Sequence, residues 1–219
     1  MENITFLIDG LNFYYSVISV EKNTGLKAKW FNYLSLCEFY KNEISKKLNK
    51  EFKIEKIFYF TALIIRTFTM GEEEYNIHKN NQLVYLRVLE DLGLKVEKSK
   101  FKKRDMECPK CGLKYYKPTE KQTDVKIAIK IFEVFYKKIS DAIVIISGDT
   151  DLVPAIRTAK NIFNNIKIGV IIPYGNRSEE LKSVSDFCYS IPSHKYINHL
   201  LPDPYKLRTE KVIHNGSIK

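Results

Sequence analysis

Two short apolar runs, each closely followed by aspartate, constrain the fold of this chain more than any other feature. Residues 4–8 read Ile-Thr-Phe-Leu-Ile and lead into Asp9. Residues 142–146 read Ala-Ile-Val-Ile-Ile, and Asp149 and Asp151 come soon after them. Runs of about five such residues are typical of strands buried on both faces, as in a parallel sheet. Ligands bind beyond the carboxyl ends of such strands, so we expect these aspartates in one pocket.

The rest of the chain alternates between strand-like and helix-like segments. Strands are predicted at residues 3–9, 53–65, 142–147, 166–172 and 187–191, with one more starting at 94. Helices are predicted at residues 11–20, 30–48, 75–92, 124–138, 150–161 and 177–184, and residues 21–29 are predicted to form a loop. This alternation indicates an α/β fold with three layers, α/β/α, around a central, mostly parallel sheet of Rossmann type.

The periodicity of the segment at residues 124–138 also predicts which of its side chains are buried. The expected apolar stripe consists of Val125, Ala128, Ile129, Phe132, Phe135 and Tyr136. Such a stripe is the pattern of a helix that packs one face on a sheet.

Length and composition allow one large domain. The 219 residues are 44% hydrophobic and 13% aromatic, enough to bury a substantial core. We expect this domain to span residues 1–200, with a basic insertion at about residues 99–121. The tail at residues 201–219 contains two prolines and few apolar residues, so it is predicted to be flexible.

Several signals bear on where the protein works. No apolar run approaches the ~18 residues of a membrane span, and the N-terminus does not resemble a secretory signal. Of the four cysteines, only Cys108 and Cys111 lie close together in the sequence. This usage suits a reducing compartment, so we expect a cytoplasmic protein that does not associate with membranes.

Charge favours an anionic partner such as nucleic acid. The formal net charge is +10, and residues 95–121 hold ten Lys or Arg against four Asp or Glu. We expect phosphate contacts from Lys98, Lys100, Lys102, Lys103 and Arg104. Tyr115 and Tyr116 would either stack on exposed bases or pack within a hairpin. A solvated lysine-rich surface is the alternative explanation of this charge.

Four aspartates form a candidate metal site: Asp9, Asp124, Asp149 and Asp151. Mg²⁺ and Mn²⁺ prefer carboxylate oxygens, and such ions can both activate a water and neutralise a leaving oxygen in phosphodiester hydrolysis. Asp9 and Asp149 are expected to be direct ligands, with Asp124 pointing into the same crevice and Asp151 acting through water. The alternative is that these residues cap helices or form turns, which are common roles for aspartate.

Neighbouring polar residues are candidates for substrate binding. Asn12 would either contact a phosphate or position Asp9, and Ser147 and Thr150 are further candidates. The backbone amides of Gly10 and Thr150 lie near helix starts, where anions bind. Two other phosphate chemistries fit less well. A haloacid-dehalogenase phosphatase requires a second acid where this chain has Leu11, and no glycine-rich P-loop is present.

Three segments resemble the signature motifs of the NYN-domain family, within the PIN-like superfamily of metal-dependent ribonucleases. They are Ile-Asp-Gly-Leu-Asn at residues 8–12, Lys-Gln-Thr-Asp-Val at 121–125 and Ser-Gly-Asp-Thr-Asp-Leu-Val-Pro at 147–154. They occur in family order across residues 3–193. Leu152 departs from the Phe that the family often has after the last Asp.

This resemblance implies a PIN-like fold and a metal-dependent endoribonuclease. Bound Mg²⁺ or Mn²⁺ would assist a water nucleophile acting on single-stranded or structured RNA, leaving a 5′-phosphate and a 3′-hydroxyl. Two alternatives remain at this point. The same fold can serve as a catalytically weak RNA-binding or protein-interaction module, and the carboxylates would also suit DNA cleavage.

The segment Cys108-Pro109-Lys110-Cys111-Gly112 resembles one knuckle of a zinc ribbon. A structural zinc ion requires four ligands, usually from two such pairs, and the chain has no second pair. Either a second chain supplies two more thiolates, which would place Zn²⁺ in a homodimer interface, or the pair is a remnant that forms a tight turn. A thioredoxin-like redox role is disfavoured because no helix start follows the pair.

Overall fold

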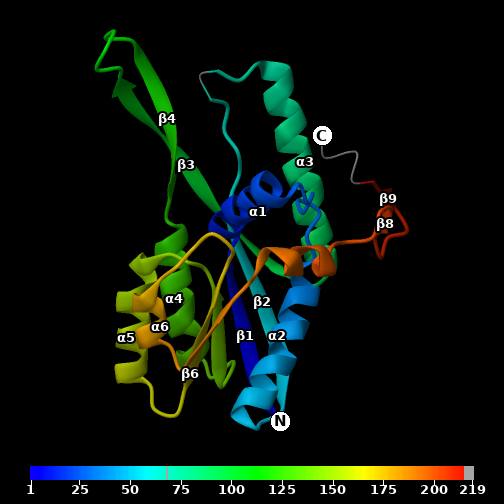
Figure 1. Cartoon of the computed structure of the whole chain (residues 1–219), viewed down its shortest axis with the longest axis vertical. Coiled ribbons are helices and arrows are strands. Elements are labelled where there is room, and N and C mark those ends of the chain that lie inside the picture. The colour runs from blue at the N-terminus through cyan, green and yellow to red at the C-terminus, as the bar shows by residue number, and fades with distance from the viewer. Residues whose placement is uncertain (68, 215–219) are drawn as a thin grey trace.

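A seven-stranded sheet, parallel except for one edge strand, forms the centre of the molecule (Figure 1). The computed structural model describes residues 1–67 and 69–214, without the side chains of residues 117 and 118. The strands are β1 (Glu2–Asp9), β2 (Phe52–Ala62), β3 (Lys95–Glu107), β4 (Lys114–Lys121), β5 (Ala142–Ile146), β6 (Lys167–Ile172) and β7 (Phe187–Ser190). Their order across the sheet is β4-β3-β2-β1-β5-β6-β7. The expected α/β class and mostly parallel sheet are confirmed.

Helices cover both faces of the sheet and complete the three layers (Figure 1). They are α1 (Gly10–Thr24), α2 (Tyr33–Leu48), α3 (Glu72–Asp91), α4 (Thr123–Tyr136), α5 (Val153–Ile162) and α6 (Glu179–Val184). One core cluster joins the sheet to α1, α2 and α3, and the other joins it to α4, α5 and α6. Side chains alternate along each strand, so Phe6 and Ile8 enter the first core while Leu7 enters the second.

The order of the strands reverses beside β1. Moving one way from β1 the chain passes through β2, β3 and β4, and moving the other way it passes through β5, β6 and β7. The neighbours β1 and β5 pair in parallel from Ile4 with Ala142 to Ile8 with Ile146. A crevice beyond the carboxyl ends of two such strands is where open α/β sheets bind ligands. Asp9 and Asp149 therefore reach this edge from segments about 140 residues apart in the sequence.

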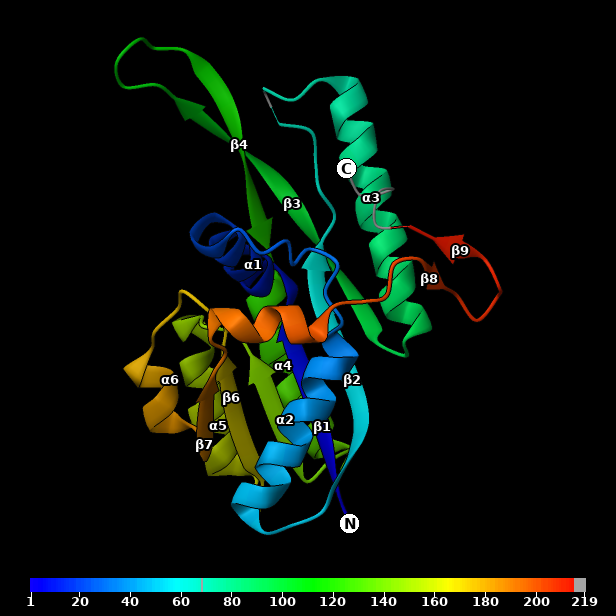
Figure 2. The same ribbon diagram turned by 45° about the vertical axis from the view of Figure 1, so that its right-hand side comes forward.

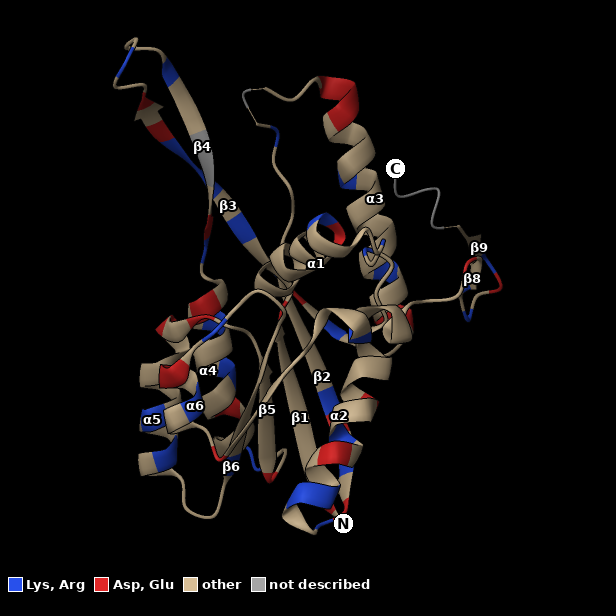
Figure 3. Ribbon diagram, viewed as in Figure 1, with Lys and Arg blue, Asp and Glu red and all other residues tan. Residues whose placement is uncertain are grey.

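The predicted basic insertion is a long hairpin that projects from the sheet (Figures 1 and 2). Its first strand, β3, pairs in parallel with β2 up to Ser99 and then in antiparallel with β4 from Lys100 onward. Blue segments in Figure 3 mark lysines and arginines along it. The sequence predicted only the start of β3, because the polar residues beyond Val96 lack the apolar alternation of a half-buried strand.

The predicted stripe of α4 is correct at Phe135, which is buried in the second core, and wrong at three other positions. Val125 and Ile129 are each 60% exposed and Tyr136 is 80% exposed, while Ile127 and Ile131 are fully buried. Apolar residues occur around the whole circumference of α4, so periodicity alone does not identify its buried face.

The predicted loop at residues 21–29 is shorter than expected. Helix α1 continues to Thr24 and ends at Gly25, whose φ of +74° suits glycine at a helix end.

The tail beyond residue 200 is not loose over the residues that the structure describes. Tyr205–Lys206 (β8) and Val212–Ile213 (β9) form a small antiparallel pair. Leu207 and Ile213 are buried in a cluster with Trp30 and with Val88 of α3. The expectation of a flexible tail is therefore wrong up to residue 214, and residues 215–219 lie outside the described part of the chain.

Candidate metal centre

Asp9 ends β1 and begins the site. Its carboxylate caps α1, because Oδ1 accepts the backbone N–H of Asn12 at 3.0 Å, and Oδ2 accepts the Ser147 hydroxyl at 2.9 Å. The next residue, Gly10, packs so closely that an added Cβ would lie 2.6 Å from the carbonyl oxygen of Phe60. Asp9 is 4% exposed, so the cap and the serine hold a nearly buried carboxylate in one orientation.

Asp149 lies on the loop that follows β5. Its backbone N–H donates to the hydroxyl of Ser147 at 3.1 Å, and its own Oδ1 accepts the N–H of Asp151 at 2.9 Å. Ser147 thus links the two aspartates, since its single hydroxyl donates to Asp9 and accepts from Asp149. Asp149 also caps the short 3₁₀ turn η1 (Thr150–Leu152). Asp9 and Asp149 therefore each cap a helical turn and also belong to the carboxylate site.

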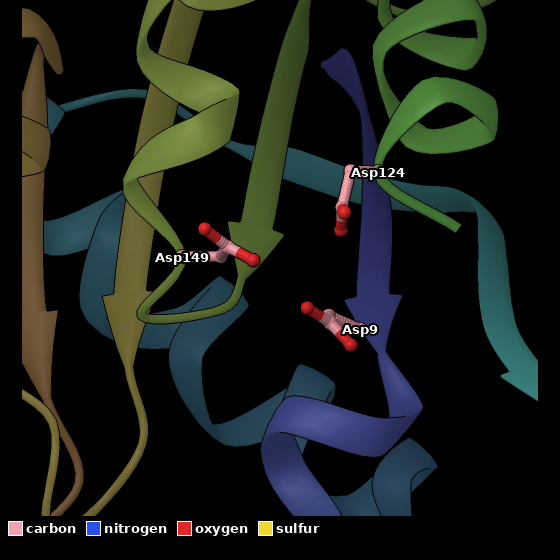
Figure 4. Close-up of side chains that lie close together, drawn as sticks. All are labelled: Asp9, Asp124 and Asp149. Atoms are coloured by element: carbon pink, nitrogen blue, oxygen red, sulfur yellow. The ribbon is translucent and has the colours of Figure 1, made fainter. Parts of the chain in front are cut away.

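Asp124 enters the site from the first turn of α4. Gln122, with φ of +82°, reverses the chain between the end of β4 and this helix. The three aspartates point toward one another in Figure 4. One carboxylate oxygen from each of Asp9, Asp124 and Asp149 lies within 4.8 Å of the other two. The convergence expected from the sequence is thus present for these three residues.

Burial and mutual repulsion disfavour the charged forms of this cluster. Burial, followed by the charges of Asp124 and Asp149, raises the pKa of Asp9 to about 6, although its two hydrogen bonds act in the opposite direction. The pKa of Asp124 is also raised to about 6, first by burial and then by Asp149, Glu120 and Asp151. A divalent cation would remove this repulsion, which gives the crowded arrangement a physical reason.

The donor set fits a hard divalent cation. Mg²⁺ binds oxygen at about 2.0–2.1 Å and larger cations at up to about 2.6 Å, so ligand oxygens on one ion lie up to about 5 Å apart. The separation of 4.8 Å fits the larger cations directly, whereas Mg²⁺, which holds opposite oxygens at most about 4.2 Å apart, would draw the carboxylates closer together. A carboxylate oxygen that already accepts one hydrogen bond retains a second lone pair, so the contacts to Asn12 and Ser147 leave Asp9 able to bind metal. Asp9, Asp124 and Asp149 could therefore hold a divalent metal.

The carboxylates lie in a cleft of about 450 Å³, and the hairpin forms its second wall. Asp9, Asp124 and Asp149 line one side together with Asn12 of α1. On the other side the hairpin contributes Phe101, Arg104, Met106, Thr119 and Glu120. The guanidinium of Arg104 thus lines the same cleft as the carboxylate cluster, with Glu120 beside it on the hairpin wall. Arginine is well suited to bind a phosphodiester whose other oxygens contact a metal ion.

Comparison with known families decides what kind of domain carries this cleft. The NYN domain matches residues 3–193, which include all three motif segments and all three converging aspartates. The chain belongs to the NYN-domain family. The family is generally nuclease-like, and the sheet with its acidic edge is consistent with a PIN-like fold.

Two individual proteins are similar to this NYN domain. The 6-hydroxy-3-succinoylpyridine 3-monooxygenase HspA of Pseudomonas putida (strain DSM 28022 / S16) is 28% identical over 187 residues, covering 76% of this chain and 58% of that protein. The chain thus spans less than two thirds of the length of this relative. A crystal structure of a protein of unknown function, VPA0982 from Vibrio parahaemolyticus RIMD 2210633, superposes with a TM-score of 0.54 at 18% identity. It covers 91% of this chain and 96% of that chain, and supports the fold alone.

The remaining predicted residues of the NYN domain occupy different positions around the cleft. Asn12 accepts the backbone N–H of Gly148 at 3.0 Å and the side-chain amide of Asn176 at 3.2 Å, so it fixes α1 to the loop after β5. Asp151 and Thr150 are exposed on η1. Asp151 is close enough to raise the pKa of Asp124, but it does not belong to the group of three.

The structure divides the predicted phosphate-binding residues between the two faces of the hairpin. Lys100, Lys102 and Arg104 alternate along β3 on the face that carries Thr119, the cross-strand partner of Lys102 and a residue of the cleft wall. Lys103 lies on the opposite face, which also carries Phe101 and Glu120 of the cleft wall. Its own Nζ lies 4.4 Å from the centroid of the Tyr116 ring.

The two tyrosines near the hairpin tip also have different surroundings. The hydroxyl of Tyr116 donates to the carbonyl oxygen of Arg66 at 2.9 Å, so this ring packs against the chain itself. Tyr115 pairs across the hairpin with Met106, which lines the cleft.

Glu120 and Asn176 are polar residues of the site that were missed from the sequence, and the rings of Tyr15 and Phe101 were missed as well. Glu120 lines the cleft, raises the pKa of Asp124 and accepts the hydroxyl of Thr123. The sequence could have indicated Glu120, because its carboxylate lies four residues before Asp124. Asn176, in the loop after β6, packs so closely on Gly148 that an added Cβ there would lie 2.6 Å from the Asn176 Cβ. Nothing in its local sequence indicates this contact, since sheet topology creates it.

A second cavity, of about 370 Å³, adjoins the cleft and is rich in aromatic side chains. Leu11, Tyr15 and Phe101 line both spaces. The second cavity continues between α1 and α3 to the buried Tyr33 and Tyr59. A flat ring system placed there would lie beside the carboxylate cluster.

No helix among residues 1–67 and 69–214 combines the length and the apolar character needed to cross a membrane. Cys108 and Cys111 lie in the turn between β3 and β4 and line neither cavity.

Proposed function

We propose that this NYN domain is a metal-dependent endoribonuclease that hydrolyses phosphodiester bonds in single-stranded regions of RNA. The observation that carries the proposal is the convergence of three carboxylates in a cleft whose opposite wall contributes Arg104. Asp9, Asp124 and Asp149 would hold Mg²⁺ or Mn²⁺, which lowers the pKa of a bound water and neutralises charge on the reacting phosphate.

The protein residues have separate parts in this reaction. Arg104 binds a non-bridging phosphate oxygen, and Ser147 holds Asp9 and Asp149 in register. Asp151, at the exposed rim, orients the attacking water. The water oxygen forms a bond to phosphorus while the bond to the 3′-oxygen breaks. The products are a 5′-phosphate and a 3′-hydroxyl, with the proton of the water passing to the solvent and the leaving oxygen taking up another.

The aromatic cavity supports an unpaired substrate. A base beside the reacting phosphate can enter it only when that base is free of a complementary strand, and stacking on aromatic side chains tolerates any base. Tyr15 and Phe101, which line both the cleft and this cavity, are the rings best placed for such stacking. Duplex RNA would keep its bases stacked inside the helix.

The decisive experiment is cleavage of a 5′-labelled single-stranded RNA by the full chain. Cleavage is expected with Mn²⁺ or Mg²⁺ and is expected to stop with EDTA, leaving fragments that carry a 5′-phosphate. Matched duplex RNA and single-stranded DNA of the same sequence test the substrate class. Tight RNA binding without cleavage in any of these metals would instead support the RNA-binding module, and absence of both would contradict the proposal.

A second candidate function is oxidation of a small heteroaromatic ring. The aromatic cavity beside the carboxylates favours it, and the similar Pseudomonas putida protein is named as a monooxygenase of a hydroxypyridine. Such a reaction inserts one oxygen atom of O₂ into the ring and reduces the other to water, with two electrons from a reduced cofactor and two protons from the solvent. Oxygen consumption with 6-hydroxy-3-succinoylpyridine and a reduced nicotinamide, measured beside the RNA assay, separates the two functions.

A further inference from the structure

The turn at the tip of the hairpin is closed by two backbone hydrogen bonds and a glycine. The N–H of Cys108 donates to the carbonyl oxygen of Leu113, and the N–H of Gly112 donates to the carbonyl oxygen of Cys108, both at 2.9 Å. Gly112 has φ of +67°, which closes the turn in a conformation that favours glycine. These contacts hold Cys108 and Cys111 on one short loop.

The sulfur of Cys108 lies beside polar groups of its own turn. They are the backbone N–H groups of Lys110 and Cys111 and the thiol of Cys111. Donors to sulfur stabilise a thiolate, which is the form that binds metals. Both cysteines are free, and Cys111 is exposed.

Two thiolates do not complete a zinc site, which requires four ligands. Within the part of the chain that the structure describes, the group of three or more metal-ligating side chains is the aspartate cluster, and neither cysteine belongs to it. The tip projects away from the body of the molecule in both views (Figures 1 and 2). The missing ligands must therefore come from outside this chain, and the tip is accessible to a second copy.

We propose that Cys108 and Cys111 of two copies of this chain bind one zinc ion through four thiolates and join the two chains at their hairpin tips. Identical tips related by a twofold axis present the same two cysteines to each other, so the contact is closed and stops at a dimer. With four protein ligands the ion has no open position, so this zinc is structural.

Charge and apolar surface at the tip agree with this arrangement. Between Glu107 and Lys114 each tip has two lysines and one glutamate, which gives a net charge of +1. A zinc ion with four thiolates carries a net double negative charge, so joining two tips around it neutralises both. Leu113, which is 54% exposed on the isolated tip, would be partly covered by the second copy.

Metal content and mass test the proposal directly. The full chain, purified under reducing conditions with zinc, is expected to contain one zinc ion per two chains and to show twice the 25.7 kDa mass of one chain in light scattering. A zinc-selective chelator is expected to return it to the monomer mass, and added zinc to restore the dimer. Cobalt in place of zinc is expected to give the intense sulfur-to-metal absorption of four thiolates.

Substitutions locate the site. The double variant Cys108→Ser with Cys111→Ser is expected to lose zinc and to be monomeric while its circular dichroism is unchanged, because both residues lie outside the core. Cys188→Ser is the matched control, since Cys188 is a partly exposed thiol of β7 far from the tip, and it should retain zinc and dimer. Absence of zinc in the wild type, one zinc per monomeric chain, or a dimer that survives both chelator and double substitution would each overturn the proposal.

Discussion

The two walls of the cleft are built in opposite ways. The carboxylate wall ends a sheet in which all five residues of β5 are buried, and its aspartates are fixed by caps and by Ser147. On the hairpin wall only Ser99, at the start of β3, is buried among the 13 residues of that strand. The carboxylate wall has the rigidity that chemistry requires, and the hairpin wall has exposed charge on a ribbon without a core. We therefore expect substitutions in the first to change catalysis and those in the second to change affinity.

Asp149→Asn should have the largest effect and test the chemical role of the first wall. It removes a ligand charge while keeping an oxygen that can cap η1, so cleavage should fall by about a thousandfold or more with the fold retained. The measurement is single-turnover cleavage of RNA at saturating enzyme with Mn²⁺.

Asp151→Asn is the control, because it lies on the same loop outside the group of three. Loss of an outer residue typically costs about 10–100-fold, so its defect should be smaller. Equal losses of cleavage rate in the two variants would contradict the assignment of Asp149 as a direct metal ligand and of Asp151 as an outer residue.

The pH dependence of stability tests whether the carboxylates are as crowded as the geometry indicates. The pKa of Asp9 in the folded chain is about 6, against 3.8 for an ordinary aspartate, so folding favours its neutral form. This stabilisation of the folded chain is complete below the ordinary pKa of aspartate and is lost as the pH rises through about 6. The difference between the two pKa values corresponds to roughly 3 kcal/mol of unfolding free energy. Asp124 acts in the same direction with a smaller effect, because it is half exposed to solvent.

Chemical denaturation of the metal-free chain between pH 4 and 8 measures this effect. Asp9→Asn keeps an oxygen for the N–H of Asn12 and should flatten the loss of stability with pH. Mn²⁺ should oppose that loss most strongly above pH 6, where the ligands are charged. A wild-type curve that coincides with the variant would mean that Asp9 is not strained by burial.

Ser147→Ala tests whether the carboxylate wall depends on its hydrogen bonds. The hydroxyl donates to Asp9 and accepts from the N–H of Asp149, so its loss should reduce metal affinity or cleavage by about 10–100-fold. Titration with Mn²⁺, followed by cleavage rate, separates weaker binding from a slower reaction. Ser183→Ala, on the exposed surface of α6, is the matched control and should leave both unchanged.

The same contrast explains which parts could be predicted from the sequence. The aspartates of β1 and β5 were predictable because an apolar run identifies a buried strand and parallel strands share one carboxyl edge. The contact of Asn176 with Asn12 was not, because it joins the loop after β6 to helix α1 across 164 residues of sequence. Tyr205 and Ile213 escaped prediction because their burial depends on tertiary contacts with Trp30 and Val88, and a short polar segment gives no periodic signal of such contacts.

On the hairpin, composition predicted a basic surface but not how its charges are divided. Lys103 and Arg104 are neighbours in the sequence, so they point to opposite faces of β3, and only the register of β3 with β4 decides which of them shares a face with Thr119. A single residue of slip in that register would exchange them, which is why their roles required the structure.

That division gives the smallest expected effect and the most direct test of the second wall. Replacing Lys100, Lys102 and Arg104 together by Gln removes up to three phosphate contacts, each worth about 0.7 in the slope of log affinity against log salt for single strands. The slope should flatten by up to about 2. Cleavage at saturating RNA should fall less than in Asp149→Asn, because the carboxylates are untouched and only the contact of Arg104 with the reacting phosphate is lost. Lys103→Gln is the matched control. Its charge lies over the Tyr116 ring on the opposite face, so the slope should stay within error of the wild type. If Lys103→Gln flattens the slope as much as the triple variant does for each residue replaced, RNA contacts both faces of the hairpin. The cleft would then not define the path of the RNA.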